Sequence, residues 1–178
     1  AVEANTIVSS TAGLDIEPSR TGSGVPATAV TYMHTVTNTG DGVDQFNFRV
    51  ASSSDASWLV DFDPATTPFL QPGEAATVMV SVTVPVDALS GTVHTLVFEA
   101  YAENPDASDT VTDITTAEGL FALELTPDNA SSLDAGQTAT YEHNLRNAGN
   151  TTDDVTLTVD GLPLDWDVSV SPETVPNF

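Results

Sequence analysis

Lysine and cysteine are both absent from this chain of 178 residues, and positive charge of any kind is scarce. Three arginines stand against 26 aspartates and glutamates, so the formal net charge at pH 7 is −23. At most three carboxylates can pair with an arginine, and the others must face water, salt or metal ions. Such a surface repels phosphate backbones and anionic lipid headgroups, which argues against nucleic acid or a membrane surface as a partner.

The missing cysteines exclude disulfides, thiolate metal sites and cysteine nucleophiles together, but they are compatible with export. No apolar run approaches the roughly 20 residues that a membrane helix needs, so we expect no membrane insertion. The opening AVEANTIVSS has neither the basic nor the apolar region of a signal peptide. We therefore expect any signal peptide to have been removed or to lie upstream, and an extracellular or cell-surface location.

An internal repeat runs through the chain. The segment Tyr32–Gly40 (YMHTVTNTG) recurs as Tyr141–Gly149 (YEHNLRNAG), a shift of 109 positions. After the loss of one residue, Trp58–Pro64 (WLVDFDP) matches Trp166–Pro172 (WDVSVSP). Matches at such scattered positions indicate two copies of one domain.

The second copy stops early, because Phe178 falls opposite Leu70 and residues 71–116 have no counterpart. That missing part is rich in strand patterns, and without it Trp166, Val168 and Val170 of the second copy would face water. We expect an N-terminal extended segment over residues 1–12, a complete domain over 13–117 and a partial second domain over 118–178.

Apolar and polar residues alternate along most of the chain, which is typical of strands with one dry and one wet face. Val78, Val80, Val82 and Val84, for example, share one face. The pattern predicts strands in the first copy near residues 13–18, 28–38, 43–51, 57–63, 75–84, 94–102 and 109–116. In the second copy it predicts strands near residues 120–126, 137–147, 152–160 and 166–171.

The last strand of the first copy is the least regular, because Val111 and Ile114 have opposite parity. A β-bulge would reconcile the two residues, and we expect one there. About seven short antiparallel strands at this length are typical of an immunoglobulin-like sandwich. The sequence therefore predicts an all-β protein of tandem immunoglobulin-like antiparallel β-sandwiches, with the second one incomplete.

Three motifs resemble those of a known family. They are the Tyr-x-His-x-Val/Leu-x-Asn-x-Gly string, the turn Leu70–Glu74 (LQPGE) before the strand Thr77–Pro85, and the approach Leu162–Trp166 (LPLDW). They look like the conserved-repeat, immunoglobulin-like domains of bacterial and archaeal cell-surface proteins. The resemblance covers nearly the whole chain from Leu14, and it implies tandem arrays in adhesin-like, sheath-like, S-layer-like or filament-forming proteins. The family has no common catalytic residues to carry over.

Two histidines occupy equivalent positions in the copies. By parity, His34 and His143 point inward, beside Tyr32 and Tyr141. Because they lie one repeat apart, they cannot share a metal ion. We expect core histidines that are hydrogen-bonded to a neighbouring strand or to a tyrosine.

Most aromatic rings also have dry-face parity. Trp58 and Trp166 are therefore expected to anchor the core rather than to stack on sugars from a wet face. Mainly Tyr101 remains as a candidate wet-face ring, and His94 has no partner in the part of the second copy that is present.

Pairs of acidic residues offer the main chance of a ligand. Calcium takes six to eight oxygens, often from alternating carboxylates and turn carbonyls. No pair repeats between the copies and EF-hand spacing is absent, so we expect diffuse or weak calcium binding, no specific metal site and no cofactor. The pairs are Asp41 with Asp44, Asp61 with Asp63, and Asp165 with Asp167.

Two sequons, Asn129-Ala-Ser131 and Asn150-Thr-Thr152, fall in predicted loops and make Asn129 and Asn150 candidates for glycosylation. Signatures of catalysis are missing, among them Gly-x-Ser-x-Gly, His-Glu-x-x-His and the glycine-rich phosphate loops. A carboxylate pair of the glycosidase kind is the one alternative. The acids here lie on solvated strand faces, so we expect no enzyme.

Two functions fit these features. The first is a structural segment of an extracellular filament, sheath or adhesin stalk, whose partners are neighbouring repeats or copies of itself. A continuation of the parent chain would then close the second domain, or residues 1–12 of another copy would do so by β-strand addition. The alternative is a carbohydrate-binding or spacer accessory module of a larger exported enzyme. A census of exposed aromatic rings would separate the two.

Overall fold

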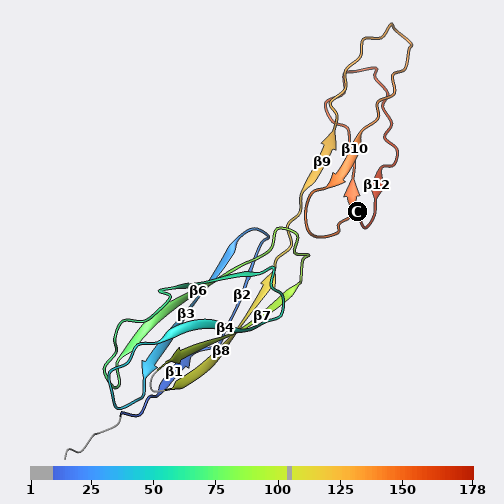
Figure 1. Ribbon diagram of the computed structural model, residues 1–178. Helices are drawn as coiled ribbons and strands as arrows, with labels where there is room; N and C mark the ends of the chain where they lie inside the picture. Colours follow the sequence, from blue (N-terminus) through green and yellow to red (C-terminus); the bar gives the residue numbers. More distant parts are fainter. Residues whose placement is uncertain (1–9, 104–105) are drawn as a thin grey trace, which may run out of the picture. The chain divides into compact units, whose positions relative to one another are not determined.

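The computed structural model describes residues 10–103 and 106–178, and within them every regular element is a strand (Figure 1). The chain divides into two compact units, Ala1–Glu118 and Gly119–Phe178. Most of the expected N-terminal extended segment, and with it the candidate donor strand, lies outside the described residues.

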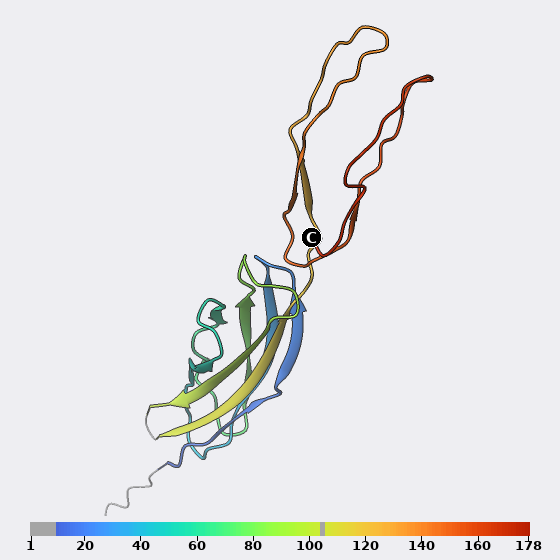
Figure 2. The same cartoon turned by 90° about the vertical axis from the view of Figure 1, so that its right-hand side faces the viewer.

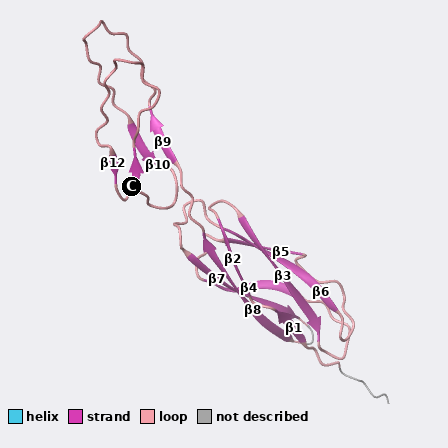
Figure 3. Ribbon diagram, turned by 180° about the vertical axis from the view of Figure 1, so that it is seen from behind, coloured by secondary structure: helices cyan, strands magenta, loops and turns pink. Residues whose placement is uncertain are grey.

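Unit 1 is a sandwich of two four-stranded sheets (Figures 1 and 3). The first sheet has the order β1 (Leu14–Glu17), β3 (Ala29–Asn38), β6 (Ala75–Thr83), β5 (Leu59–Asp63). The second has the order β2 (Arg20–Gly24), β8 (Ala107–Ala117), β7 (Val93–Ala102), β4 (Asn47–Ser53). All pairs are antiparallel except β2 with β8, which is parallel.

Strand alternation builds the core of unit 1. In β6 and just after it, Val78, Val80, Val82 and Val84 are fully buried, as the sequence predicts. The facing sheet contributes the inward residues of β7, among them Phe98. Side chains of one parity from each sheet thus fill the space between the layers, as in other aligned sandwiches.

Strand β2 was not predicted, because the first predicted strand ends at Pro18. The chain instead crosses to the other sheet and forms the five-residue β2 beside β8. Glycine at position 22 makes this approach possible. A Cβ atom there would lie 2.9 Å from the Tyr32 hydroxyl oxygen and 3.0 Å from a carbon of its ring.

Val50 pairs with the buried Phe98 and so lies on the predicted face, but it is 43% exposed because β4 is at the edge of its sheet. The prediction of a bulge in the last strand is wrong. Strand β8 has no bulge, because its register with β7 is continuous. Ile114 is 37% exposed, while Asp113 and Thr115 occupy the buried positions beside Val111.

Unit 2 contains four short strands in two pairs. They are β9 (Leu123–Thr126) with β10 (Asn144–Asn147), and β11 (Val155–Thr156) with β12 (Thr174–Val175). Long loops join the members of each pair (Figure 2). The strands β10 and β11 are much shorter than the predicted strands over 137–147 and 152–160. The predicted strand over 166–171 is not formed.

A turn at the end of β3 is held by the side chain of Asn38. Its Nδ2 donates to Gly42 O at 2.8 Å and to Leu70 O at 2.9 Å. Its Oδ1 accepts the backbone N–H of Gly40 at 2.9 Å. One buried amide thus ties the end of β3 to two other parts of the chain.

The same three bonds recur in unit 2. Nδ2 of Asn147 donates to Thr151 O and to Phe178 O, both at 2.8 Å. Its Oδ1 accepts the backbone N–H of Gly149 at 2.9 Å. The partners are those that the sequence alignment pairs with the partners of Asn38.

Candidate functional site

A buried polar network joins the two sheets of unit 1. Nδ1 of His34 lies 2.9 Å from Pro18 O, and Nε2 lies 3.0 Å from Oδ2 of Asp113. Both side chains are fully buried. The other carboxylate oxygen of Asp113 accepts the backbone N–H of Arg20 at 3.0 Å. A strand of one sheet, β3, is thereby fastened to β8 and β2 of the other.

The hydrogen-bond partners of His34 determine how many protons the His34–Asp113 pair carries. A carbonyl oxygen can only accept, so Nδ1 of His34 carries a hydrogen and donates it to Pro18 O. A single further proton lies between Nε2 and Asp113 Oδ2, whichever atom holds it. The pair is therefore neutral as a whole, so that no net charge is buried between the sheets.

Tyr32 extends the network by one layer. Its hydroxyl donates to Ile114 O at 3.2 Å and lies 2.7 Å from Oγ1 of Thr115. Burial raises the pKa of Tyr32, the Thr115 hydrogen bond opposes this, and the negative charge of Asp113 adds to it. His34, Asp113 and Thr115 are fully buried, so the network binds the two sheets together.

A second buried cluster stacks Trp58 on His94. The ring centroids are 4.9 Å apart and the planes differ by 6°. Trp58 is 3% exposed, which confirms the predicted core position. Ser53 Oγ donates to Asp55 O, so it must accept from Nε2 of His94, 2.8 Å away. Nδ1 is left as a buried lone pair, without a partner in the described part of the chain.

Burial lowers the pKa of His94 below its ordinary value of 6.5, and the charge of Asp55 opposes the shift. The folded protein therefore binds this proton less readily than the unfolded chain does. The stabilisation is complete above the unfolded pKa and is lost as the pH falls through the folded one.

The free energy of unfolding should accordingly fall as the pH drops below about 6.5. Urea unfolding of the wild type and of His94→Phe at several pH values between about 7.5 and 5.5 tests this. The phenyl ring can still stack on Trp58 but does not titrate, so the variant should show the shallower dependence. Parallel curves for the two proteins would contradict the assignment.

Tyr101 is the wet-face ring that the sequence singled out. The guanidinium carbon of Arg49 lies 4.5 Å from the centre of this ring, so one ring face is already covered. Arg49 Nε also donates to Glu99 Oε2 at 2.6 Å. This hydrogen bond, followed by one from Ser108, lowers the pKa of Glu99. The cluster is an ion pair packed on an aromatic ring.

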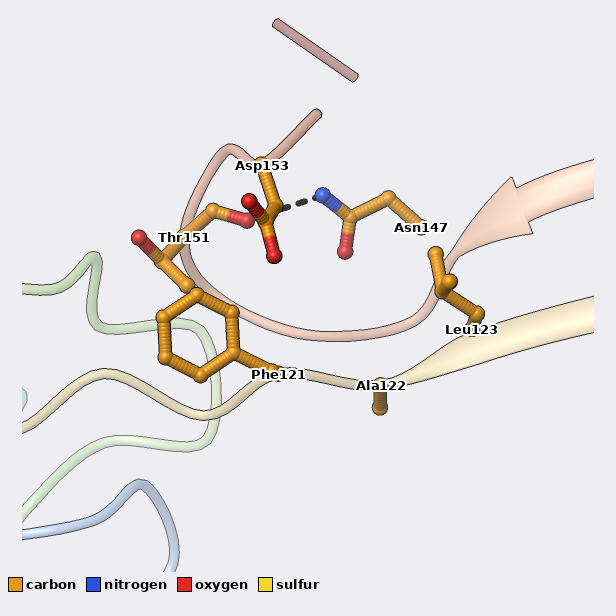
Figure 4. A pocket seen from close by; sticks show the side chains of 6 residues that line it. All are labelled: Phe121, Ala122, Leu123, Asn147, Thr151 and Asp153. Atoms are coloured by element: carbon orange, nitrogen blue, oxygen red, sulfur yellow. Dashed lines mark hydrogen bonds between the residues drawn. The ribbon is translucent and has the colours of Figure 1, made fainter. Parts of the chain in front are cut away.

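The hollows in the described surface include two shallow ones, one in each unit. One, of about 250 Å³, is lined by Asp55, Ser57, Trp58, Pro85, Asp87, Ala88, Leu89 and Thr92. The other, of about 240 Å³, belongs to unit 2 and is lined by Phe121, Ala122, Leu123, Asn147, Thr151 and Asp153. Figure 4 shows the amide of Asn147 turned toward the Thr151 turn at this hollow.

The remaining predicted residues are dispersed. Asp41 Oδ1 accepts the backbone N–H of Thr11 at 2.6 Å, and Asp44 Oδ1 accepts that of Gln45 at 2.8 Å. Both carboxylates therefore bind backbone N–H groups of the fold, that of Asp41 across 30 positions of the chain. Across the described residues, no three carboxylates or imidazoles gather in a way that could hold a metal ion. The pairs Asp61 with Asp63 and Asp165 with Asp167 are exposed.

The two sequons differ in their surroundings. Asn129 is exposed, and its Nδ2 donates to Glu142 O at 3.1 Å. Asn150 is half-buried, and its Oδ1 accepts the backbone N–H of Leu120 at 2.6 Å. The histidine and tryptophan of unit 2 that were expected in the core, His143 and Trp166, are exposed. None of the described residues forms a helix that could cross a membrane.

Residues 25–101 match the family model described as the NPCBM-associated, NEW3 domain of alpha-galactosidase. No curated protein matches the chain. The ASH/PapD-like domain of human CEP192 is similar at 8% identity and a TM-score of 0.46, over 58% of this chain and 84% of that one.

The chaperone DraB of E. coli is similar at 15% identity and a TM-score of 0.42, over 58% of this chain and 54% of that one. A family 123 glycoside hydrolase from Clostridium perfringens is similar at 8% identity and a TM-score of 0.40, over 55% of this chain and 22% of that one. Unit 1 has the predicted immunoglobulin-like β-sandwich fold, and residues 25–101 are similar in sequence to the NEW3 domain.

Proposed function

We propose that unit 1 is a non-catalytic accessory module of an exported, glycan-active protein, and that it serves as a spacer between other domains. The similarity of residues 25–101 to the NEW3 domain of alpha-galactosidase carries this proposal. It favours the second of the two functions expected from the sequence over a filament or adhesin segment. The acidic surface suits an extracellular location.

The use of aromatic rings favours a spacer over a sugar-binding module. Sugar-binding surfaces need flat rings with a free face on the outside. In unit 1, Trp58 and Tyr32 are buried in the core and bound to partners inside it. Tyr101 lies under Arg49. These three rings therefore stabilise the sandwich, whereas the ring of Phe69 is 71% exposed.

The domains linked to unit 1 provide the test. The native polypeptide that contains residues 10–118 should be captured with an antibody and sequenced by mass spectrometry. We expect a glycoside hydrolase domain in the same chain and hydrolysis of at least one p-nitrophenyl glycoside. A native chain made only of sandwich repeats, and assembled into filaments, would overturn the proposal and support the structural alternative.

Binding to insoluble polysaccharides separates the spacer from the sugar-binding version. We expect a fragment of residues 10–118 not to be retained on cellulose, chitin or galactomannan, because Trp58 and Tyr32 are buried and Tyr101 is covered by Arg49, which leaves Phe69 as the large exposed aromatic ring in the described part of this unit. Retention that is lost in Tyr101→Ala but kept in Met33→Ala would instead identify the outer face of the second sheet as a sugar site. Met33 lies exposed on the other sheet and serves as the matched control.

Salt should stabilise the protein. The net charge is −23, and the described ion pairs between arginine and carboxylate are Arg49 with Glu99 and Arg146 with Glu124. At 0.10–0.15 M salt the Debye length shortens repulsion to about 8–10 Å. The melting temperature should rise from low salt to molar NaCl, and calcium should act at lower concentration. A melting temperature that is flat across this range would contradict the expectation.

A further inference from the structure

Unit 2 repeats the backbone pairing of the first half of unit 1. The strands β9 and β10 pair with Leu123 opposite Asn147, and β1 and β3 pair with Leu14 opposite Asn38. The alignment of the two copies makes these pairs equivalent. The turn after β10 is also held by the same amide bonds as the turn after β3.

The position of Phe178 is equivalent to that of Leu70. Phe178 exchanges two backbone hydrogen bonds with Asp153, of 2.8 and 3.1 Å. Leu70 exchanges two with Asp44, of 2.8 and 3.0 Å. In unit 1, the turn that leads into β6 follows Leu70 directly. The backbone at Phe178 thus lies where a β6-like strand would begin.

Burial is what separates the two units. Tyr32 is 5% exposed and its counterpart Tyr141 is 44% exposed. Trp58 is 3% exposed and its counterpart Trp166 is 62% exposed. The large rings that form the core of unit 1 are therefore open to solvent in unit 2, which is costly for a folded domain.

Unit 1 shows which strands cover these rings. Nine residue pairs join β3 to β6. Trp58 stacks on His94 of β7, and the hydroxyl of Tyr32 binds Thr115 of β8. His34 takes its carboxylate partner, Asp113, from β8 as well. All of these partners come from β6, β7 and β8, which have no counterpart in unit 2.

We infer that unit 2 is an acceptor for a three-stranded segment of the β6–β8 kind, which enters directly after Phe178 and closes a second sandwich. The unit also sets the chemistry of the segment. Its last strand should place a carboxylate against His143 and a hydroxyl against Tyr141. Its middle strand should place a flat ring on Trp166. A single strand donated by another copy would pair with one sheet only and would leave the second sheet uncovered.

An extended chain tests the inference. A second copy of the sequence Gln71–Ala117 is joined after Phe178, in a Trp58→Phe background that leaves Trp166 as the one tryptophan. We expect the emission of Trp166 to shift to shorter wavelength and its quenching by acrylamide to fall severalfold. Unit 1 remains in every version, so its own unfolding shows that the protein is folded.

Two matched controls sharpen the test. The same extension with aspartate at its copies of Val80 and Val82 cannot form a dry face, and should leave Trp166 as accessible as in the unextended chain. The extension with alanine at its copy of Asp113 should unfold at a lower urea concentration than the extension with asparagine there, because only asparagine can still bind His143.

Other results would overturn the inference. One is a Trp166 that stays equally accessible with and without the intact extension while unit 1 is folded. Another is a Trp166 in the unextended chain that becomes protected as the protein concentration rises, because a second copy would then cover the open face. The test does not depend on what unit 1 is attached to, so its failure would leave the proposed spacer function untouched.

Discussion

Replacing Trp58 with alanine is expected to lower the free energy of unfolding of unit 1 by about 3–5 kcal/mol, the usual cost of emptying a buried site of a large aromatic ring. The indole is almost completely buried and stacks on His94. Its removal leaves a cavity between the sheets and one side of the imidazole without contact. Urea unfolding followed by circular dichroism measures the change.

The chain supplies two matched controls. Leu59 is adjacent in sequence but is 68% exposed, so Leu59→Ala should change stability by less than about 0.5 kcal/mol. Trp166 occupies the equivalent position of unit 2 but lies open, so Trp166→Ala should leave the unfolding of unit 1 unchanged. A loss below about 1 kcal/mol for Trp58→Ala would mean that the faces of this strand are reversed.

Asp113→Ala is expected to cost about 3–5 kcal/mol, because it leaves a buried partner without its counterpart. The substitution removes the carboxylate that binds Nε2 of His34 and the acceptor for the backbone N–H of Arg20. His34 is fully buried, so its Nε2 cannot bind water instead. The free energy of unfolding, measured in urea, is again the readout.

Asparagine at position 113 separates hydrogen bonding from charge. Its Oδ1 can still accept from Arg20, and its Nδ2 can donate to Nε2 of a neutral His34 that keeps its hydrogen on Nδ1. Asp113→Asn should therefore cost much less than Asp113→Ala. Equal losses for the two variants would contradict the network as described.

A double variant tests whether the pair acts as a unit. Two apolar side chains of similar size often replace a buried polar pair at little cost. His34→Leu combined with Asp113→Leu should therefore lose less stability than the sum of the two single variants. Simple additivity would show that the two residues contribute independently.

The sandwich was predictable from the sequence because its signal is local. Alternating valines such as Val78 and Val80 report the dry face of a strand directly, and both are buried. Strand β2 gave no such signal. It is five residues long, contains Gly22 and Gly24, and has a single strand neighbour, β8, whose register was unknown. Its position is set by the fold rather than by its own composition.

The buried network was harder to predict, because its residues are far apart in the sequence. His34 and Asp113 are separated by 79 positions. Ile114 is apolar, so the sequence suggested that its side chain points inward like that of Val111. Because the two residues have opposite parity, this led to the wrong expectation of a bulge. The usable signal was the series Val111, Asp113, Thr115, in which one aliphatic and two polar residues share the dry parity. A polar residue in such a series needs a buried partner, and the inward-facing His34 was the available one.

The strands of unit 2 show the opposite case. The alternation of Trp166, Val168 and Val170 predicted a strand, but the described structure has none there. A β-strand is stabilised by its neighbours rather than by its own sequence. The equivalent strand of unit 1, β5, pairs with β6. Unit 2 has no counterpart of β6. Its residues 166–170 therefore have the alternation of a strand but no neighbouring strand to pair with.

The parallel pairing of β2 with β8 determines how unit 1 responds to mechanical force. Tension applied to the two ends of this unit pulls β2 toward its N-terminus and β8 toward its C-terminus. Because the two strands are parallel, they are pulled in opposite directions along their common axis. The hydrogen bonds between Arg20–Gly24 and Asp113–Ala117 are then loaded together in shear. In an antiparallel pair pulled at one end, the bonds would break one after another. Unit 1 is therefore expected to resist stretching between its two ends through this pair of strands.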